Sequence, residues 1–353
     1  MILMVRFRKA MFFLGAVVFL SCMLPAVSRA EVQDNLSQCA AIEDDLLRLQ
    51  CYDGMANRGS ASVEKAEPVN KLDTCVAPVA KPSYLSRLWE LDRDQSRGEF
   101  AIRMHRSNYI LPFSFNFSPN EDPIKDGFPG RKVQKSEATF QLSFKTKLWE
   151  DIGGKNNVDL WLGYTQRSFW QVYNVDQSSP FRETNYEPEL LLNLPMELNV
   201  LGMTLRTINF GMNHQSNGRA ESLSRSWNRI VANFGFERKG LFSTHDSLVV
   251  ELKSWYRIPE DSESDDNPDI EDYLGYGEIR TSYFWKNYRY SMMVRNNLDD
   301  DENRGAIQLD WSFPLNNRIS GYLQYYLGYG ESLLDYNHSV NRVGLGFILT
   351  EWN

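Results

Sequence analysis

The sequence contains little cysteine and little histidine, four residues of each in a chain of 353. Cys39, Cys51 and Cys75 lack the spacing of a metal site and have no histidine near them, which argues against structural zinc. Acidic residues outnumber basic residues by 46 to 38, and the resulting net charge of −8 argues against a nucleic-acid partner.

Long apolar runs are also absent after residue 30. No later stretch approaches the roughly 18 apolar residues that a membrane-spanning helix needs. The mean hydropathy of the chain, −0.45, is that of a soluble protein. Any insertion of the mature chain into a membrane therefore cannot depend on apolar helices.

The first 30 residues have the pattern of a secretory signal peptide. A positively charged start precedes an apolar run over 10–24, and small residues then lead to an expected cleavage site after Ala30. Two alternatives stay open. One is an uncleaved anchor, for which the run is short, and the other is a lipoprotein signal at Cys22. A signal peptide at 1–30 predicts export to an oxidising compartment.

Residues 31–95 are predicted to form a periplasmic extension, either a tail or a plug. Cys39 and Cys51 flank a helical pattern, so a local disulfide is expected, although pairing of Cys75 with either of them stays open. The stretch 56–71 is small and charged and is typical of a linker. A short helix is expected over 85–91.

From Glu99 onward the apolar residues alternate with polar ones, which is a strand pattern. We count about twelve such segments, near 99–116, 135–149, 157–172, 186–195, 201–216, 226–238, 246–257, 271–284, 287–297, 304–313, 317–329 and 337–350. The short connections (150–156, 196–200, 239–245, 285–286, 314–316) alternate with longer polar ones (117–134, 173–185, 217–225, 258–270, 298–303, 330–336).

This pattern predicts an all-β fold for 96–353, a twelve-stranded antiparallel transmembrane β-barrel of the outer membrane. The apolar side chains would face lipid, and the polar ones, such as Glu251, Lys253 and Asp310, would face the lumen. Charges of both signs favour a filled lumen over a wide pore. A soluble β-sandwich is the alternative fold, but it would not require export together with twelve long strands.

One predicted hairpin carries three side chains suited to nucleophilic catalysis. His214 and Ser216 share a face with apolar residues on the first strand, and Asn228 does so on the second. If the loop is symmetric about Glu221, His214 and Asn228 are cross-strand neighbours. Ser216 would be the nucleophile, His214 the base and Asn228 the residue that orients the imidazole.

Backbone N–H groups of Asn217 and Gly218 are candidate oxyanion donors, because they directly follow the serine. The alternative interpretation of all these polar residues is an ordinary loop edge. Against it, polar side chains on a lipid-facing surface are costly where no structure requires them.

The same stretches resemble the outer-membrane phospholipase A family of Gram-negative bacteria. The resemblance is carried by 211–219 (GMNHQSNGR), 224–229 (SRSWNR), 178–188 (SSPFRETNYEP), 266–270 (DNPDI) and 329–336 (YGESLLDY). It extends from about residue 80 to the carboxyl end and leaves most of the amino-terminal extension outside.

The resemblance implies calcium-dependent hydrolysis of phospholipid acyl esters, of phospholipase A1, A2 and lysophospholipase type, at the outer leaflet. It implies His214, Ser216 and Asn228 as catalytic residues and Gly218 as an oxyanion donor. It also implies a homodimer with shared Ca2+ sites: the Arg219 carbonyl and Ser224 hydroxyl from one subunit, and a serine equivalent to Ser178 from the other. Gln166 falls at a polar dimer-interface position, and outer-membrane lipids would surround the barrel.

Two departures from the family pattern stand out. Glu221 replaces an aspartate, and we count it as a further candidate calcium ligand. The chain also ends in Trp352-Asn353 rather than on an aromatic residue. The acidic loop 260–272 is expected to be a solvated surface that meets cations bridging surface lipopolysaccharide. A passive porin and a barrel enzyme of another class, such as a surface protease, are the rival functions.

Overall fold

The computed structural model describes residues 82–127, 130, 132–154 and 158–349. The predicted signal peptide, the three mature cysteines and Trp352-Asn353 lie outside these residues. The strands are β1 (Ile102–Met104), β2 (Tyr109–Asn116), β3 (Ser136–Trp149), β4 (Asp159–Trp170), β5 (Phe181–Val200), β6 (Met203–Ser216), β7 (Ser226–Lys239), β8 (Asp246–Arg257), β9 (Gly277–Trp285), β10 (Tyr288–Asn296), β11 (Gly305–Pro314), β12 (Ile319–Gly328) and β13 (Val340–Leu349). Short helices are α4 (Tyr84–Trp89), η1 (Arg93–Gln95), α5 (Asp122–Gly127), η2 (Val175–Gln177), η3 (Glu221–Leu223) and α6 (Ile270–Leu274).

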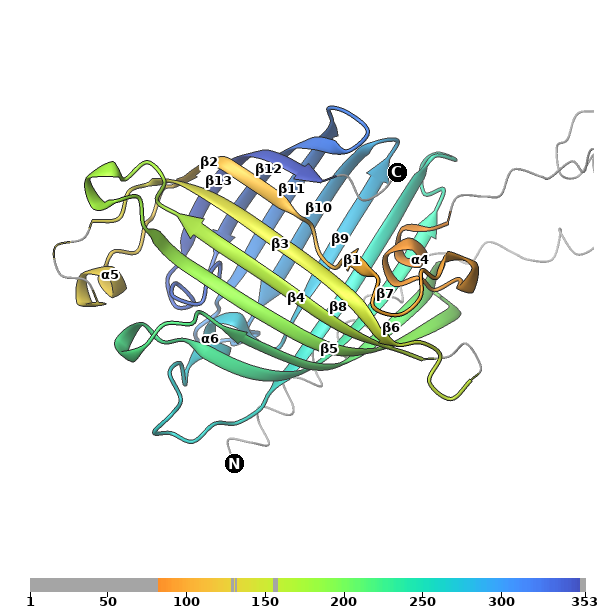
Figure 1. Cartoon of the computed structure of the whole chain (residues 1–353), viewed down its shortest axis with the longest axis horizontal. Helices are drawn as coiled ribbons and strands as arrows, with labels where there is room; N and C mark the ends of the chain where they lie inside the picture. Colours follow the sequence, from red (N-terminus) through yellow and green to blue (C-terminus); the bar gives the residue numbers. More distant parts are fainter. Residues whose placement is uncertain (1–81, 128–129, 131, 155–157, 350–353) are drawn as a thin grey trace, which may run out of the picture. The chain divides into compact units, whose positions relative to one another are not determined.

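The strands form one closed antiparallel barrel (Figure 1). From β2 to β13 each strand pairs with its neighbours in sequence, and β13 closes the barrel onto β2. Among the described strands, β2 to β13 are each paired on both sides, as a lipid environment requires, while the short β1 has one partner, β3. The predicted twelve-stranded barrel is confirmed, with one extra strand because the first predicted strand is divided into β1 and β2, which both pair with β3.

The division between β1 and β2 lies at residues 105–108, where the chain leaves the ladder. Asn108 fills the gap with its side chain: Oδ1 accepts from the Ser143 N–H at 2.7 Å, and Nδ2 donates to the Ser143 carbonyl at 2.9 Å. The Arg106 N–H donates to the Ser143 hydroxyl at 3.0 Å. Side chains thus replace the missing backbone hydrogen bonds in a wall where water cannot.

Two other boundaries differ from the prediction. β5 extends to Val200, so 196–200 is strand, and the turn to β6 is Leu201-Gly202, whose φ angles are 54° and 79°. A bulge between Pro195 and Leu198 had interrupted the alternation in sequence. The first residues of the predicted strand 271–284 instead form α6, and β9 begins at Gly277.

Helices cover the two ends of the barrel, with α4 at one end and α5 and α6 at the other (Figure 1). α4 packs into the lumen, where Leu85 and Trp89 are buried against Trp161. Its first N–H group, that of Tyr84, donates to Glu237 at 3.0 Å. α6 joins the same apolar cluster through Ile270. Among the described residues no helix is both long enough and apolar enough to span a bilayer.

Candidate functional site

β6 and β7 form the hairpin that holds the candidate catalytic side chains. His214 lies directly opposite Asn228 in the ladder, which is the register that a loop centred on Glu221 requires. The Nδ1 atom of His214 and Oδ1 of Asn228 are 2.9 Å apart. Because the amide oxygen can only accept, this contact assigns the proton to Nδ1 and leaves Nε2 as the basic nitrogen.

Ser216 lies two residues beyond His214, on the same outer face of the barrel. In the ladder it stands between Tyr186 of β5 and Ser226 of β7. Exposed Phe210 and Met212 precede His214 on this face, so the apolar outer surface leads directly to the site. Within the described part of the chain no hydrogen bond joins Ser216 to His214. Catalytic contacts are often long before substrate binds and shorten in the complex.

The structure of the loop 217–225 distinguishes between the two candidate oxyanion donors, the N–H groups of Asn217 and Gly218. The Asn217 N–H donates to the Arg225 carbonyl at 3.0 Å and is therefore occupied. The Gly218 N–H has no acceptor among the described residues. Gly218 has a φ of 61°, and a Cβ added there would lie 3.2 Å from the Tyr186 ring. Only glycine fits this position without strain, and its N–H is the better candidate donor.

Asn217 holds the loop 217–225 closed. Its side chain is 4% exposed, donates to the Leu223 carbonyl at 2.8 Å, and accepts from the N–H groups of Arg219 at 3.2 Å and Arg225 at 3.0 Å. The Leu223 side chain packs with Ile124 of α5 beneath the loop. The loop that carries the expected calcium ligands is therefore ordered by one buried amide.

The expected calcium ligands of one subunit lie in this loop. The Ser224 hydroxyl donates to Asp266 at 2.5 Å, which brings a carboxylate from the loop after β8 beside it. Glu221 is exposed and has a φ of 55°. Hydroxyl, carbonyl and carboxylate oxygens are the ligands that Ca2+ prefers, so these residues fit the ion. Within the described residues no group of three or more His, Cys, Asp or Glu could hold a metal.

Ser178 lies in a different loop, the one between β4 and β5. It follows η2 with a φ of 59°, and its backbone N–H donates to the Val175 carbonyl at 3.2 Å. Its expected role as a calcium ligand from a second subunit stays a prediction. Gln166 lies on the outer face next to Tyr186, and its side chain contacts Tyr164 and Ser168 at 3.2 Å.

The loop after β8 contributes to the site, which sequence reasoning missed. We expected 260–272 to be a solvated surface. Residues 261–264, 266 and 268 are exposed, as expected. Glu260, however, accepts a hydrogen bond from Asn228 at 3.0 Å, and the buried Asn267 accepts one from the Ser226 N–H at 2.9 Å. The Tyr336 hydroxyl donates to Asp269, and burial together with this contact raises the pKa of Tyr336. Loop residues carry no periodicity, so only the run of acids could have drawn attention to them.

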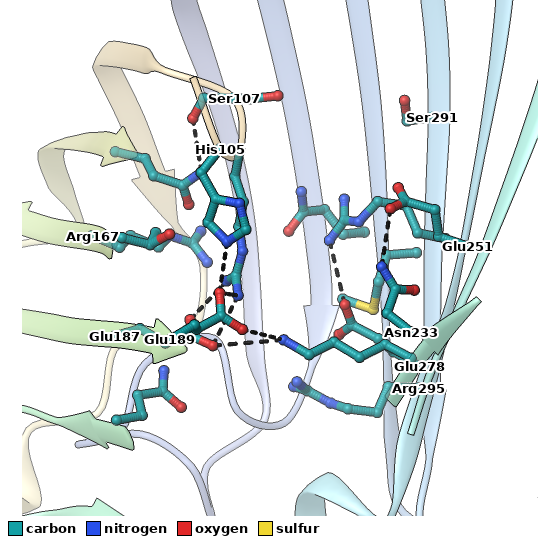
Figure 2. A pocket seen from close by; sticks show the side chains of 18 of the residues that line it. His105, Ser107, Arg167, Glu187, Glu189, Asn233, Glu251, Glu278, Ser291 and Arg295 are labelled. Atoms are coloured by element: carbon teal, nitrogen blue, oxygen red, sulfur yellow. Dashed lines mark hydrogen bonds and ion pairs between the residues drawn. The ribbon is translucent and has the colours of Figure 1, made fainter. Parts of the chain in front are cut away.

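The lumen holds a separate polar cavity of about 270 Å³. Figure 2 shows His105 and Glu189 in contact there. The Nε2 atom of His105 and Oε2 of Glu189 are 2.8 Å apart. Arg106 contacts Glu187 and Glu189 at 2.7 and 2.6 Å, and Lys253 contacts Glu189 at 3.1 Å. Paired charges of both signs line this cavity, as the alternation predicts. The cavity lies inside the barrel, whereas His214, Ser216 and Asn228 lie outside.

A closed barrel with an apolar outer surface is a membrane barrel, and the serine, histidine and asparagine on that surface are the residue types of a nucleophilic hydrolase. A family model described as Phospholipase A1 matches residues 85–349. A relative from Neisseria meningitidis serogroup B is 33% identical and aligns over 95% of each chain. The phospholipase A1 of Escherichia coli (strain K12) is 35% identical over 78% of this chain and 89% of that protein.

Among solved structures, the calcium-bound dimer of Salmonella typhi outer membrane phospholipase is 35% identical. The match covers 75% of this chain and 97% of that one, with a TM-score of 0.66. The chain belongs to the phospholipase A1 family of outer-membrane phospholipases. It is a carboxylic ester hydrolase built on a Gram-negative outer-membrane β-barrel.

Proposed function

We propose that the chain hydrolyses acyl esters of phospholipids, as a phospholipase A1, phospholipase A2 and lysophospholipase, at the outer leaflet. The observation that carries this proposal is the His214–Asn228 contact of 2.9 Å on the apolar outer face, with Ser216 beside it. A substrate that is itself part of the membrane reaches this face by lateral diffusion, without passing through the filled lumen.

Each side chain has one role in the reaction. The Ser216 oxygen attacks the ester carbonyl while Nε2 of His214 takes its proton. Asn228 holds the other ring nitrogen, so the imidazole keeps the correct tautomer and orientation. The Gly218 N–H donates to the oxyanion. His214 then protonates the leaving lysophospholipid, and water, deprotonated by His214, releases the fatty acid from Ser216.

Calcium and a second copy of the chain complete the proposed site. The Arg219 carbonyl and Ser224 hydroxyl, with Glu221 and Asp266 nearby, would hold the ion, and the second subunit would supply its Ser178 position. Bound calcium supplies positive charge that stabilises the oxyanion. This proposal is supported by the oxygen-rich loop and by the Salmonella typhi structure, which is a dimer with bound calcium.

The test is hydrolysis of phospholipid in mixed detergent micelles, with and without calcium, together with crosslinking. Ser216→Ala should lower kcat by about 10⁴-fold or more, because no other group replaces the nucleophile. Ser226→Ala is the matched control, since Ser226 is the cross-strand neighbour of Ser216 on the same face. Hydrolysis by folded Ser216→Ala at the control rate would overturn the assignment.

The rival function, a passive porin, predicts ion conductance without hydrolysis. The paired charges that fill the lumen argue against a wide conducting path. Planar-bilayer conductance measured beside hydrolysis on the same preparation separates the two functions. A surface-protease mechanism would instead require acidic catalytic residues above the lumen and would resist a serine-directed sulfonyl fluoride.

A further inference from the structure

Among the described residues, Glu260 makes the contact that extends the candidate triad beyond Asn228. Its Oε1 accepts a hydrogen bond from Nδ2 of Asn228 at 3.0 Å, while Oδ1 of the same amide faces Nδ1 of His214 at 2.9 Å. Asn228 therefore uses both ends of its amide, one toward an imidazole and one toward a carboxylate. The chain of contacts runs from His214 through Asn228 to Glu260.

The loop that carries Glu260 is held in place by other residues. Arg257 bonds the Asp265 carboxylate at 2.6 Å and the Asn267 carbonyl at 3.2 Å, and the Ile258 N–H continues the ladder to the Asn228 carbonyl at 2.8 Å. Half-buried Glu260 makes none of these contacts. Its side chain is thus available for the amide without being required for the loop.

The carboxylate changes what the amide can do for the imidazole. A neutral amide stabilises an imidazolium less than a carboxylate does, because it bears no net charge. When its N–H donates to an anion, charge shifts toward its oxygen, and hydrogen bonds in such a chain strengthen one another. The negative charge of Glu260 thereby stabilises the protonated imidazole of His214, although the two side chains do not touch.

We propose that Glu260 is a positioning residue for the hydrolytic reaction, acting through Asn228 to fix and stabilise the protonated form of His214. The inference rests on the proposed function and adds a fourth member to it. The proton taken from Ser216 stays on Nε2 of His214, and none passes to Asn228 or Glu260. Asparagine suits position 228 because it donates to one neighbour and accepts from the other. An aspartate there would meet Glu260 with like charge.

The first test measures kcat and KM for single variants in calcium-saturated micelles. Glu260→Ala should lower kcat about tenfold and leave KM within about twofold, since the contact acts on the protonated imidazole rather than on substrate binding. Glu260→Gln keeps an acceptor oxygen and should lower kcat less, by about threefold. Glu263→Gln is the matched control: the same loop and residue type, exposed, with unchanged kcat expected.

The second test is a double-mutant cycle, and it asks whether the second substitution raises or lowers the kcat of the first variant. Asn228→Asp places a carboxylate against Glu260 and should lower kcat about 100-fold, while adding Glu260→Gln supplies an amide donor and should recover about tenfold. A merely structural role for Glu260 predicts two losses that multiply. Heat-modifiable gel mobility reports folding of each variant, and if Glu260→Ala does not fold, the Gln variant and the cycle decide the question.

Two results would overturn the inference: kcat of Glu260→Ala equal to that of Glu263→Gln, or no recovery in the double variant. Either of these with Ser216→Ala inactive would remove Glu260 from the mechanism and leave the proposed function standing. Full hydrolysis by Ser216→Ala would instead remove the proposed function itself.

Discussion

Asn217→Ala should weaken the response of the enzyme to calcium far more than it weakens the barrel. The substitution removes three hydrogen bonds that close the loop 217–225: one donated to the Leu223 carbonyl, and two accepted from the N–H groups of Arg219 and Arg225. Arg219 and Ser224 of this loop are the proposed calcium ligands. The strands on either side keep their own ladder.

The magnitude follows from burial of the amide. Asn217 is 4% exposed, so solvent does not replace the lost partners easily. At about 1 kcal/mol for each neutral hydrogen bond, the closed loop loses roughly 3 kcal/mol. If the loop must then close on binding, the apparent calcium affinity falls by the closed fraction, up to about 100-fold. Saturating calcium should restore most of kcat.

A second external loop offers a matched control. Asn297 uses a similar arrangement: it donates to the Glu302 carbonyl at 2.8 Å and accepts from the N–H groups of Asp299 at 3.2 Å and Arg304 at 3.0 Å. It also donates to the Asp272 carbonyl of α6 at 2.7 Å. Asn297→Ala should therefore disturb a loop at least as much as Asn217→Ala does, without changing the calcium response. The assay is a calcium titration of micellar hydrolysis. Equal half-saturation concentrations for the two variants would refute the reasoning.

Further outcomes can be measured on the same preparation. Gly218→Ala should lower kcat at least about tenfold, because a Cβ strains the positive φ and meets Tyr186, and unchanged kcat would exclude the Gly218 N–H as oxyanion donor. Asn108→Ala should lower the unfolding midpoint in urea, because the Ser143 N–H loses its acceptor, at about 1–3 kcal/mol, and the Ser143 carbonyl keeps only the 3.4 Å contact from the His105 N–H. An unchanged midpoint would show that Asn108 does not stabilise the gap between β1 and β2. Chelation of calcium should abolish hydrolysis reversibly, and activity in excess chelator would contradict the proposed role of the ion.

The barrel could be predicted from sequence because the alternation of apolar and polar residues indicates which face of the wall each side chain occupies. Along β6 and β7 every fully buried residue belongs to one parity, and His214, Ser216 and Asn228 belong to the other. The same alternation predicts His214 opposite Asn228, because strand pairing has a single register once the loop centre is fixed, and the ladder has that register.

Three other features could not be predicted: the gap between β1 and β2, the end of β5 and the contacts of the loop after β8. They depend on individual side chains rather than on the alternating pattern. Asn108 replaces ladder bonds at the gap between β1 and β2, and no alternation marks such a residue. The bulge that follows Pro195 interrupts the alternation, so the end of β5 could not be recognised in the sequence. Asp266 and Glu260 reach the hairpin from a loop distant in sequence, and their contacts depend on how Arg257 folds that loop.

The two sides of the β6–β7 hairpin constrain how this protein can change during evolution. Asn213 and Arg229, the chain neighbours of His214 and Asn228, point inward, and each contacts Glu187, at 2.7 and 3.3 Å. Inserting or deleting one residue would exchange the faces of the strand concerned, and would turn His214 into the lumen if it occurred in β6 or Asn228 if it occurred in β7. Changes in length are therefore confined to the loops, so related enzymes can diverge in calcium response and surface recognition while the length of these two strands stays fixed.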